Sequence, residues 1–392
     1  MKRSVVVIGV VILVLATVSI LVWLGYSQSW TGFQAYIDST GGYHPTKTLW
    51  NWIELLIIPV VLVAGVLLLV AAMLKSRRET SDQRAATERA IAEDRDREVA
   101  LQAYVDRIGE WMLERNLGVT EAAQGVARAR TLATLRILDK GRKGLLILFL
   151  HDAELINGDT PVIALHGADL REIDLQEAKL NGVNLRGANL EGANLQLADL
   201  EDADLREAKL KEADLRAATL HRANLRQANL EAAKLLEANL FQADLQKADL
   251  HKAYLNKASL REAILHGADL SRAVLYGAFL QRATLQWAHL YGANLTNADL
   301  SGADLQEANM RGAGLYGASL READLQKADL RAANLQQADL EAANLQGADL
   351  QQTDLRGAHL HRANLTDVNL EGANLKKADL KGATMADGTV YP

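Results

Sequence analysis

Residues 223–245 read ANLRQANLEAAKLLEANLFQADL, and the same five-residue pattern continues on both sides of this stretch. From Leu165 to Met385 every fifth residue is Leu, except for Met310 and Met385, over 45 consecutive positions. The residue two before each of these positions is Ala in 40 cases, and the residue directly before it is Asp or Asn in 29. Such regular repetition predicts a solenoid, in which each repeat packs only on its neighbours.

A period of five fits neither the helical period of about 3.6 nor the strand period of about 2. A chain that turns a corner every five residues does bury Leu and Ala together. Four such sides make a square coil of twenty residues, and successive coils stack about 4.8 Å apart. Ala lies beside Leu because a narrow lumen cannot hold two large side chains per side. Asp and Asn suit the corners, where their short side chains bond to turn backbone. The sequence therefore predicts an all-β solenoid of about eleven coils in residues 161–392.

The A-[DN]-L-x-x pattern of these 45 units resembles the pentapeptide-repeat family. The resemblance implies that family's fold, a right-handed quadrilateral β-helix, whereas the period alone does not determine handedness. Three other segments, at 48–50, 101–104 and 127–132, look like bacterial membrane-anchored members of the family. For those members the resemblance implies no assigned activity.

Two apolar runs, at about 5–24 and 53–74, precede the repeats. Twenty helical residues extend roughly 30 Å, the thickness of a bilayer core. We therefore predict a two-helix transmembrane hairpin in residues 1–74, with the lipid bilayer as a partner. Basic residues precede the first run and follow the second (Lys2, Arg3, Lys75, Arg77 and Arg78). This charge pattern predicts that both termini lie in the cytoplasm. Together with the resemblance to bacterial membrane-anchored members, it implies the inner (plasma) membrane of a bacterium.

Residues 75–160 are predicted to form a charged helix and a small α-helical adaptor. The expected helices are 75–115, 121–140 and 143–156. The first carries an apolar stripe at helical spacing, Leu101, Tyr104, Ile108 and Trp111. This stripe predicts either packing on the next two helices or a coiled-coil dimer. The predicted domains are thus 1–74, 75–160 and 161–392.

Composition excludes several classes of function. The chain has no cysteine, which rules out disulfides and thiolate chemistry, and a net charge of −6, which argues against general nucleic-acid binding. None of the common phosphate-binding, zinc-protease or hydrolase motifs occurs. A uniform rod also offers no strained turn or cleft for catalysis. We therefore predict a non-enzymatic protein with no catalytic, metal or cofactor site.

The function predicted on these grounds is a membrane-anchored cytoplasmic scaffold or adaptor that presents a rod-like surface to other proteins. One alternative, which the family resemblance implies, is mimicry of duplex DNA to regulate an enzyme such as gyrase. The rod is only weakly acidic for that role, with 32 acidic and 25 basic residues after position 160. A second alternative is a channel, because residues 40–43 (TGGY), between the two apolar runs, faintly resemble a potassium-channel ion filter. The full TVGYG-type run and an apolar pore helix before it are missing, which disfavours this alternative.

An interaction site is predicted where the repeats lose their corner polarity. Of the eight residues directly before Leu between positions 254 and 289, only Asp269 is Asp or Asn. In a twenty-residue coil Val274 lies directly over Tyr254, with Tyr276 beside them and Phe279 on the next side. Outward residues have no core to fill, so they should form an exposed apolar patch for an unidentified protein partner or a homodimer. The predicted patch is Tyr254, Ile264, Val274, Tyr276, Phe279, Trp287, Tyr291 and Tyr316.

Overall fold

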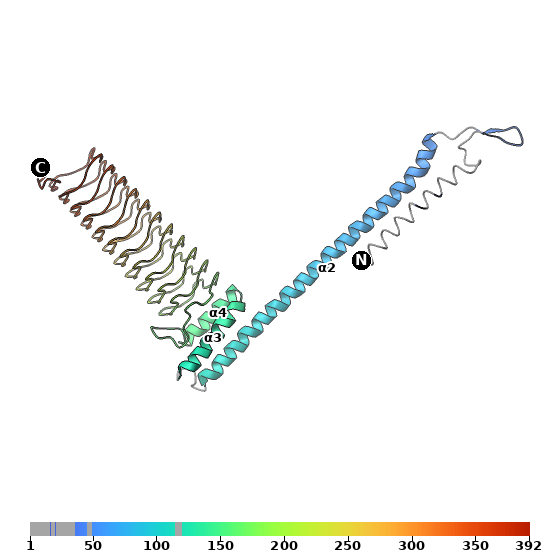
Figure 1. The fold of residues 1–392 in the computed structure, drawn as a ribbon, viewed down its shortest axis with the longest axis horizontal. Coiled ribbons are helices and arrows are strands. Elements are labelled where there is room, and N and C mark those ends of the chain that lie inside the picture. The colour runs from blue at the N-terminus through green and yellow to red at the C-terminus, as the bar shows by residue number, and fades with distance from the viewer. Residues whose placement is uncertain (1–15, 17–19, 21–35, 45–48, 114–119) are drawn as a thin grey trace. The chain divides into compact units, whose positions relative to one another are not determined.

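The computed structural model describes residues 16, 20, 36–44, 49–113 and 120–392. The chain divides into two compact units, Met1–Ala92 and Glu93–Pro392. Figure 1 labels the helices of both units. The predicted division at residues 74 and 160 stays a prediction.

The first unit contains a small hairpin and the beginning of a long helix. Strand β1 (Tyr36–Ile37) pairs antiparallel with β2 (Tyr43–His44). The Asp38 Oδ1 oxygen accepts hydrogen bonds of 2.9 Å from the backbone N–H groups of Thr40 and Gly42. Residues 40–43, considered above as an ion filter, therefore form the turn and the start of the second strand. Helix α2 (Leu49–Leu113) follows.

The predicted inner-membrane localisation is wrong. Among the residues that the structure describes, no helix combines the length and the apolar character needed to cross a bilayer. The predicted span 5–24 lies outside the described residues, except for residues 16 and 20.

The second unit begins with the C-terminal part of α2 and two shorter helices. Helix α3 (Glu121–Ile137) begins where the Thr120 hydroxyl accepts a hydrogen bond from the backbone of Ala123. Helix α4 (Lys140–Asp152) begins where the Asp139 carboxylate accepts bonds from the two backbone N–H groups that follow Lys140. Both residues are good N-caps because they satisfy N–H groups that have no partner inside the helix.

The apolar stripe of α2 packs within the chain. Leu101, Tyr104 and Ile108 are buried, and Trp111 is partly buried against the same core. The Tyr104 hydroxyl lies 2.6 Å from the hydroxyl of Thr131 in α3. Desolvation by burial raises the pKa of Tyr104 to about 12. The stripe therefore packs on the following helices, the first of the two predicted alternatives.

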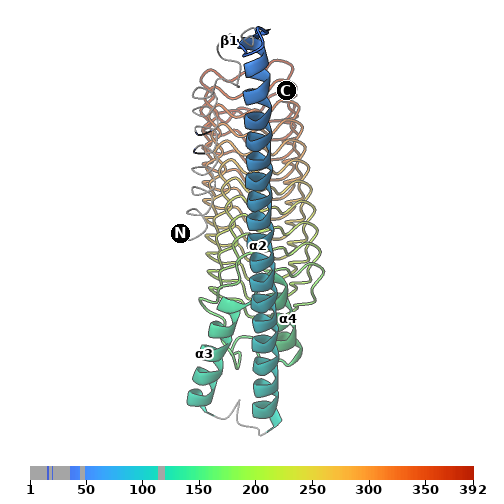
Figure 2. The ribbon, with the colours of Figure 1, turned by 90° about the vertical axis from the view of Figure 1, so that its right-hand side faces the viewer.

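Helices α3 and α4 lie at the N-terminal end of the stacked coils, as Figures 1 and 2 both show. Three side chains of α4, Leu146, Ile147 and Leu150, are fully buried. The Lys140 carbonyl of α4 accepts a 3.2 Å hydrogen bond from the backbone N–H of Asp174 in the first coil. This covering is needed because an open coil end exposes both apolar side chains and unpaired backbone groups.

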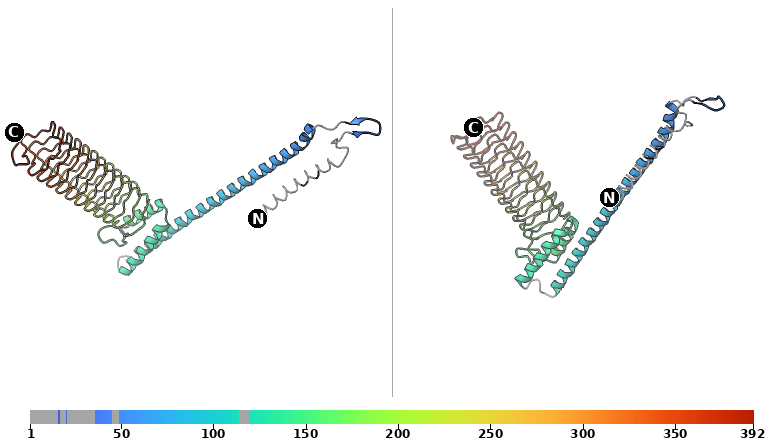
Figure 3. Two further views of the ribbon diagram at one scale, coloured as in Figure 1. Left: turned by 45° about the horizontal axis from the view of Figure 1, so that its top comes forward. Right: turned by 45° about the vertical axis from the view of Figure 1, so that its right-hand side comes forward.

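Residues 165–385 form coils of twenty residues, which stack as regular rungs in Figure 3. Backbone hydrogen bonds link each rung to the next. In a middle coil, the N–H of Leu225 donates to the Asp244 carbonyl of the next coil at 2.7 Å. The N–H of Asn224 donates to the Ala203 carbonyl of the previous coil at 2.9 Å. Parallel bridges join residues twenty apart from Asp169 to Thr384, as the square coil predicts.

Each corner is a tight turn with one residue in the left-handed region. At the corner after Leu225, the N–H of Ala228 donates to the Leu225 carbonyl at 3.0 Å, and Gln227 has φ of +58°. Positive φ at this position is what a type II turn requires. The Asn224 Oδ1 oxygen accepts a 3.3 Å bond from the N–H of Arg226, which otherwise has no backbone partner. This bond explains why Asp or Asn precedes Leu in most repeats.

The lumen contains only the repeated Leu and Ala side chains along most of the rod, and these are 0–1% exposed from Leu180 to Leu365 with few exceptions. The last coil is less well covered, since Leu370, Leu375 and Leu380 are only partly buried. After it the chain folds back, and the N–H of Tyr391 donates to the Ala383 carbonyl at 2.8 Å.

Candidate functional site

The coil repeat decides which outward residues are neighbours. Because bridges join residues twenty apart, such residues form columns along the rod. The bridge between Tyr254 and Val274 places one directly over the other, which confirms the predicted stacking. Four columns of bridged residues exist, one per side, and a two-residue corner separates each side from the next.

The eight predicted patch residues do not lie on one surface. Tyr254 and Val274 lie on one side, with Tyr276 and Tyr316 at the corner that follows it and Tyr291 at the corner that precedes it. Phe279 lies around the corner on the next side. Ile264 lies ten residues around the coil from both Tyr254 and Val274, on the opposite side, and Trp287 lies at the corner that follows that opposite side. The structure therefore brings together five of the eight and separates the other three.

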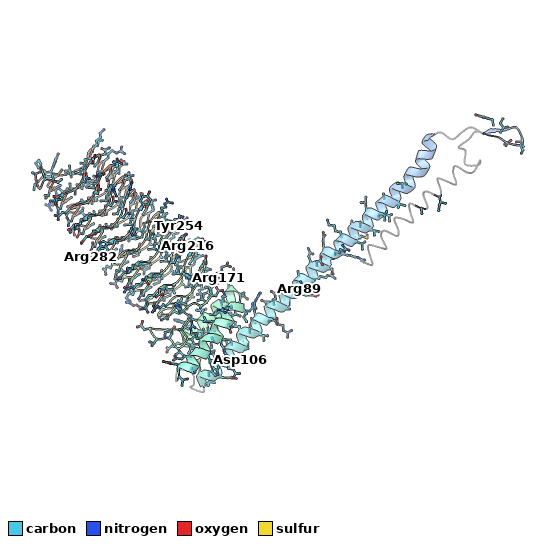
Figure 4. All side chains as sticks on the ribbon, in the orientation of Figure 1. Arg89, Asp106, Arg171, Arg216, Tyr254 and Arg282 are labelled. Atoms are coloured by element: carbon cyan, nitrogen blue, oxygen red, sulfur yellow. The ribbon has the colours of Figure 1, made fainter. Side chains whose placement is uncertain are left out.

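We define the tyrosine face as the outward residues of segments 251–257, 271–277, 291–297, 311–317 and 331–337. These segments occupy the same side and its two flanking corners in five successive coils. The four tyrosines of this face, Tyr254, Tyr276, Tyr291 and Tyr316, are 49%, 44%, 47% and 39% exposed. Figure 4 shows Tyr254 on the rod near Arg216, a residue of the corresponding segment two coils earlier.

The aromatic side chains outside this face make contacts within the rod. The Arg261 guanidinium lies 4.9 Å from the ring centroid of Phe279. The rings of Trp287 and His266 are 5.6 Å apart. The rings of Phe241 and His221 are 5.2 Å apart. Such stacking along a column stabilises neighbouring coils without any external partner.

The tyrosine face is positively charged, although the whole chain has a net charge of −6. Its five segments contain five basic residues and no acidic residue, the basic ones being Lys252, Lys257, Arg272, Arg311 and Arg331. The remaining residues between positions 251 and 337 contain eight acidic and four basic residues. Every acidic side chain of these coils therefore belongs to another side of the rod.

Three of these cations make no ion pair in the described residues, although Glu231 and Asp329, both outside the face, lie close enough to Lys252 and Arg311 to interact electrostatically. Arg331 pairs with Asp329 at 2.6 Å and, by its hydrogen bond, lowers the pKa of that carboxyl. Arg311 occupies the corresponding position one coil earlier but has the neutral Asn309 in place of Asp329. Within the part of the chain that the structure describes, Arg311, Lys252 and Arg272 make no ion pair. Lys257 pairs with Glu237 at 3.8 Å.

Sequence reasoning missed these unpaired cations and one apolar residue. Leu236 is 38% exposed and lies one coil before Asn256, at the same corner as Tyr276 and Tyr316. The unpaired cations and Leu236 can be recognised in the sequence when it is written in rows of twenty residues, because residues that are neighbours in adjacent coils then stand in one column.

The side chains of the tyrosine face are better suited to binding a partner than to catalysing a reaction. In the described residues, no group of three or more His, Asp or Glu side chains is placed to hold a metal ion. Several acidic side chains of the early coils are paired with arginine. Asp204 and Asp214 bond to Arg206 and Arg216, which lowers both carboxyl pKa values against the opposing effect of desolvation by burial.

Comparisons with known proteins agree with the repeat. The family described as pentapeptide repeats (8 copies) matches six segments between residues 164 and 382. No curated protein matches the chain. The crystal structure of HetL, a pentapeptide repeat protein involved in heterocyst differentiation regulation from the cyanobacterium Nostoc sp. strain PCC 7120, is 39% identical. The aligned part covers 56% of this chain and 92% of HetL, with a TM-score of 0.29.

Two further structures are similar in the same region. QnrB1, a plasmid-mediated fluoroquinolone resistance protein, is 18% identical over 45% of this chain and 89% of its own, with a TM-score of 0.24. A pentapeptide repeat protein from the thylakoid lumen of Arabidopsis thaliana is 31% identical over 27% of this chain and 68% of its own, with a TM-score of 0.16. Since the family match extends over more than half of the sequence, the chain belongs to the pentapeptide-repeat family, whose fold is a right-handed quadrilateral β-helix.

Proposed function

We propose that this protein is a non-enzymatic scaffold or adaptor and that it binds another protein through the tyrosine face. The observation that carries the proposal is the gathering of four exposed tyrosines on one side of the rod and its two corners. Tyrosine is enriched at protein interfaces because it combines a large rigid apolar area with a polar tip. Exposed apolar patches of this kind mark interaction sites.

The rigidity of the rod supports the same function. Each outward side chain of the face stands on a backbone that is hydrogen-bonded to the coils above and below. A surface that is ordered before binding loses little conformational entropy when a partner docks. Extended faces of solenoids are suited to binding for this reason.

Duplex mimicry remains the alternative function, and it would use the other sides of the rod. The acidic residues gather most densely between positions 199 and 214. There Arg222 bonds to both Glu201 and Asp202, at 2.7 Å in each case. Since such pairs neutralise much of the acidic surface, we place the alternative second.

A matched pair of variants tests the proposal. In the first, Tyr254, Tyr276 and Tyr316 are all changed to Ser. In the control, three aromatics outside the face, Phe241, Phe279 and Trp287, are changed to Ser. The tagged full chain is crosslinked in cells of its natural source, and captured proteins are compared by mass spectrometry. We expect the wild-type and control chains to capture a common partner that the face variant loses. Equal capture by all three folded chains contradicts the proposal.

A further inference from the structure

We infer that the partner of the tyrosine face is an acidic, extended segment of a protein, whose carboxylates bind Lys252, Arg272 and Arg311 while its apolar side chains pack on the tyrosines. The inference rests on the proposed function and adds to it the chemistry of the partner. It depends on charge complementarity between this face and an anion.

The distribution of charge is the first argument. The five segments of the face hold five cations and no acid, whereas the other sides of the same coils hold eight acids and four cations. The other sides therefore carry a net charge of 4 − 8 = −4 and repel anions, whereas the face carries +5 and attracts them. Within these five coils, an acidic segment is thus attracted to this face.

The lack of internal pairing is the second argument. Lys252 and Arg272 lie one directly over the other in adjacent coils, about 4.8 Å apart along the rod. Like charges stacked in this way destabilise a sheet. Elsewhere on the rod several arginines pair with an Asp two residues before them, as Arg216 does with Asp214. Lys252 and Arg272 have a buried Leu at that position and Arg311 has the neutral Asn309, so none of the three can pair in this way. An acidic ligand would supply the missing partners.

The dimensions of the face favour a short extended peptide. Five coils at about 4.8 Å spacing extend roughly 19 Å from first to last. An extended chain rises about 3.3 Å per residue, so about six residues cover that length. In an extended segment every second side chain faces the rod. When carboxylate and apolar residues follow one another at these rod-facing positions, the carboxylates meet the flanking cations and the apolar side chains meet the central tyrosines.

A nucleic acid fits the same face less well. Aromatic and basic side chains together can bind single strands. However, acidic residues begin immediately around the corners on both neighbouring sides, at Asp269 and Asp299. These acidic residues would repel a polyanion, which carries a charge on every nucleotide. A nucleic acid would also extend well beyond the face, whose length is roughly 19 Å from the coil spacing. A peptide with few carboxylates avoids this repulsion.

The test uses the full chain and a fluorescein-labelled synthetic peptide with the sequence Glu-Ser-Phe-Ser repeated three times, which places Glu and Phe in turn on one face of an extended chain. Binding is measured by fluorescence anisotropy at about 50 mM and about 300 mM salt, since added salt screens exposed charges. Oligothymidine of the same length serves as the nucleic-acid probe. The face variant changes Lys252, Arg272 and Arg311 to Glu.

A control variant with the same change of net charge separates position from overall electrostatics. It changes Lys247, Arg282 and Arg362 to Glu, which are exposed cations outside the face and make no ion pair in the described part of the chain. We expect the peptide to bind the wild-type and control chains, more weakly at high salt, and the face variant to bind at least about tenfold more weakly than the control.

Each other outcome has a defined meaning. No peptide binding by the wild-type chain, or equal loss in both charge variants, overturns the inference. Tighter binding of oligothymidine than of the peptide, lost in the face variant, shows a nucleic-acid surface instead. If the Ser variant of Tyr254, Tyr276 and Tyr316 loses its cellular partner while the Glu variant keeps it, the proposed function stands and the acidic partner is refuted.

Discussion

Replacing Leu225 with Ala tests whether the lumen is packed as tightly as the structure indicates. Leu225 is fully buried and lies in the middle of the rod. The change removes three carbon atoms, worth about 2.4 kcal/mol at about 0.8 kcal/mol for each buried methylene. The remaining cavity adds to this loss, and measured Leu to Ala changes in cores cost about 2–5 kcal/mol.

The hydrogen bonds of the Leu225 backbone determine whether the loss of stability lies at the low or the high end of this range. Its N–H is bonded to the next coil at 2.7 Å, and its carbonyl accepts the turn bond from Ala228 at 3.0 Å. The wall therefore cannot move inward without breaking these bonds, and the cavity stays open. We expect a loss of about 3–5 kcal/mol in the free energy of unfolding.

The opposite change, Ala228→Leu, should also destabilise the rod, by about 1–3 kcal/mol, because Ala228 is fully buried beside Leu side chains. Urea unfolding of the full chain, followed by circular dichroism, measures both. Arg226→Ala is the control, since Arg226 points outward in the same repeat, and it should stay within about 0.5 kcal/mol of wild type. An unchanged midpoint for Ala228→Leu would refute the narrow, close-packed lumen.

Two further predictions concern the corners and the pH dependence of stability. Gly317→Ala should destabilise the rod more than Gly312→Ala in urea unfolding. An added Cβ at Gly317 would lie 2.6 Å from Asn297 Oδ1, whereas nothing lies within 4 Å of an added Cβ at Gly312. Both glycines have positive φ, so equal losses of stability would show that backbone strain alone matters. The hydrogen bond from Arg171 holds the pKa of Asp169 at about 2, below its ordinary value of about 3.9. Between about pH 4 and pH 2 the unfolded chain therefore binds more protons than the folded chain. The stabilisation by this pair is complete above about pH 4 and is lost as the pH falls towards about 2. Arg171→Gln should flatten this part of a profile of unfolding free energy against pH, and an unaltered profile would contradict the prediction.

The repeat itself was predictable from the sequence because its information is local. Leu and Ala at fixed spacing allow only one arrangement in which both are buried, and the Asp or Asn before Leu bonds within its own turn, as Asn224 does. Four sides per coil and the stacking of Val274 on Tyr254 followed from the same period. The helices predicted at 121–140 and 143–156 are found as α3 and α4, which end a few residues earlier than expected, at Ile137 and Asp152. The runs 53–74 and 75–115 belong to one continuous helix, α2.

Which outward residues lie together on one face of the rod was decided only by the tertiary structure. Ile264 and Trp287 are near Tyr276 in sequence, but the coil carries Ile264 to the opposite side and Trp287 to a corner beside it. Arg311 is 59 residues after Lys252 and yet belongs to the same face. The reason is that neighbours across coils are set by closure of the twenty-residue turn and not by distance along the chain. A five-residue period determines only whether a side chain points inward or outward, whereas the side on which it lies, and the charges it meets there, depend on how the whole coil closes.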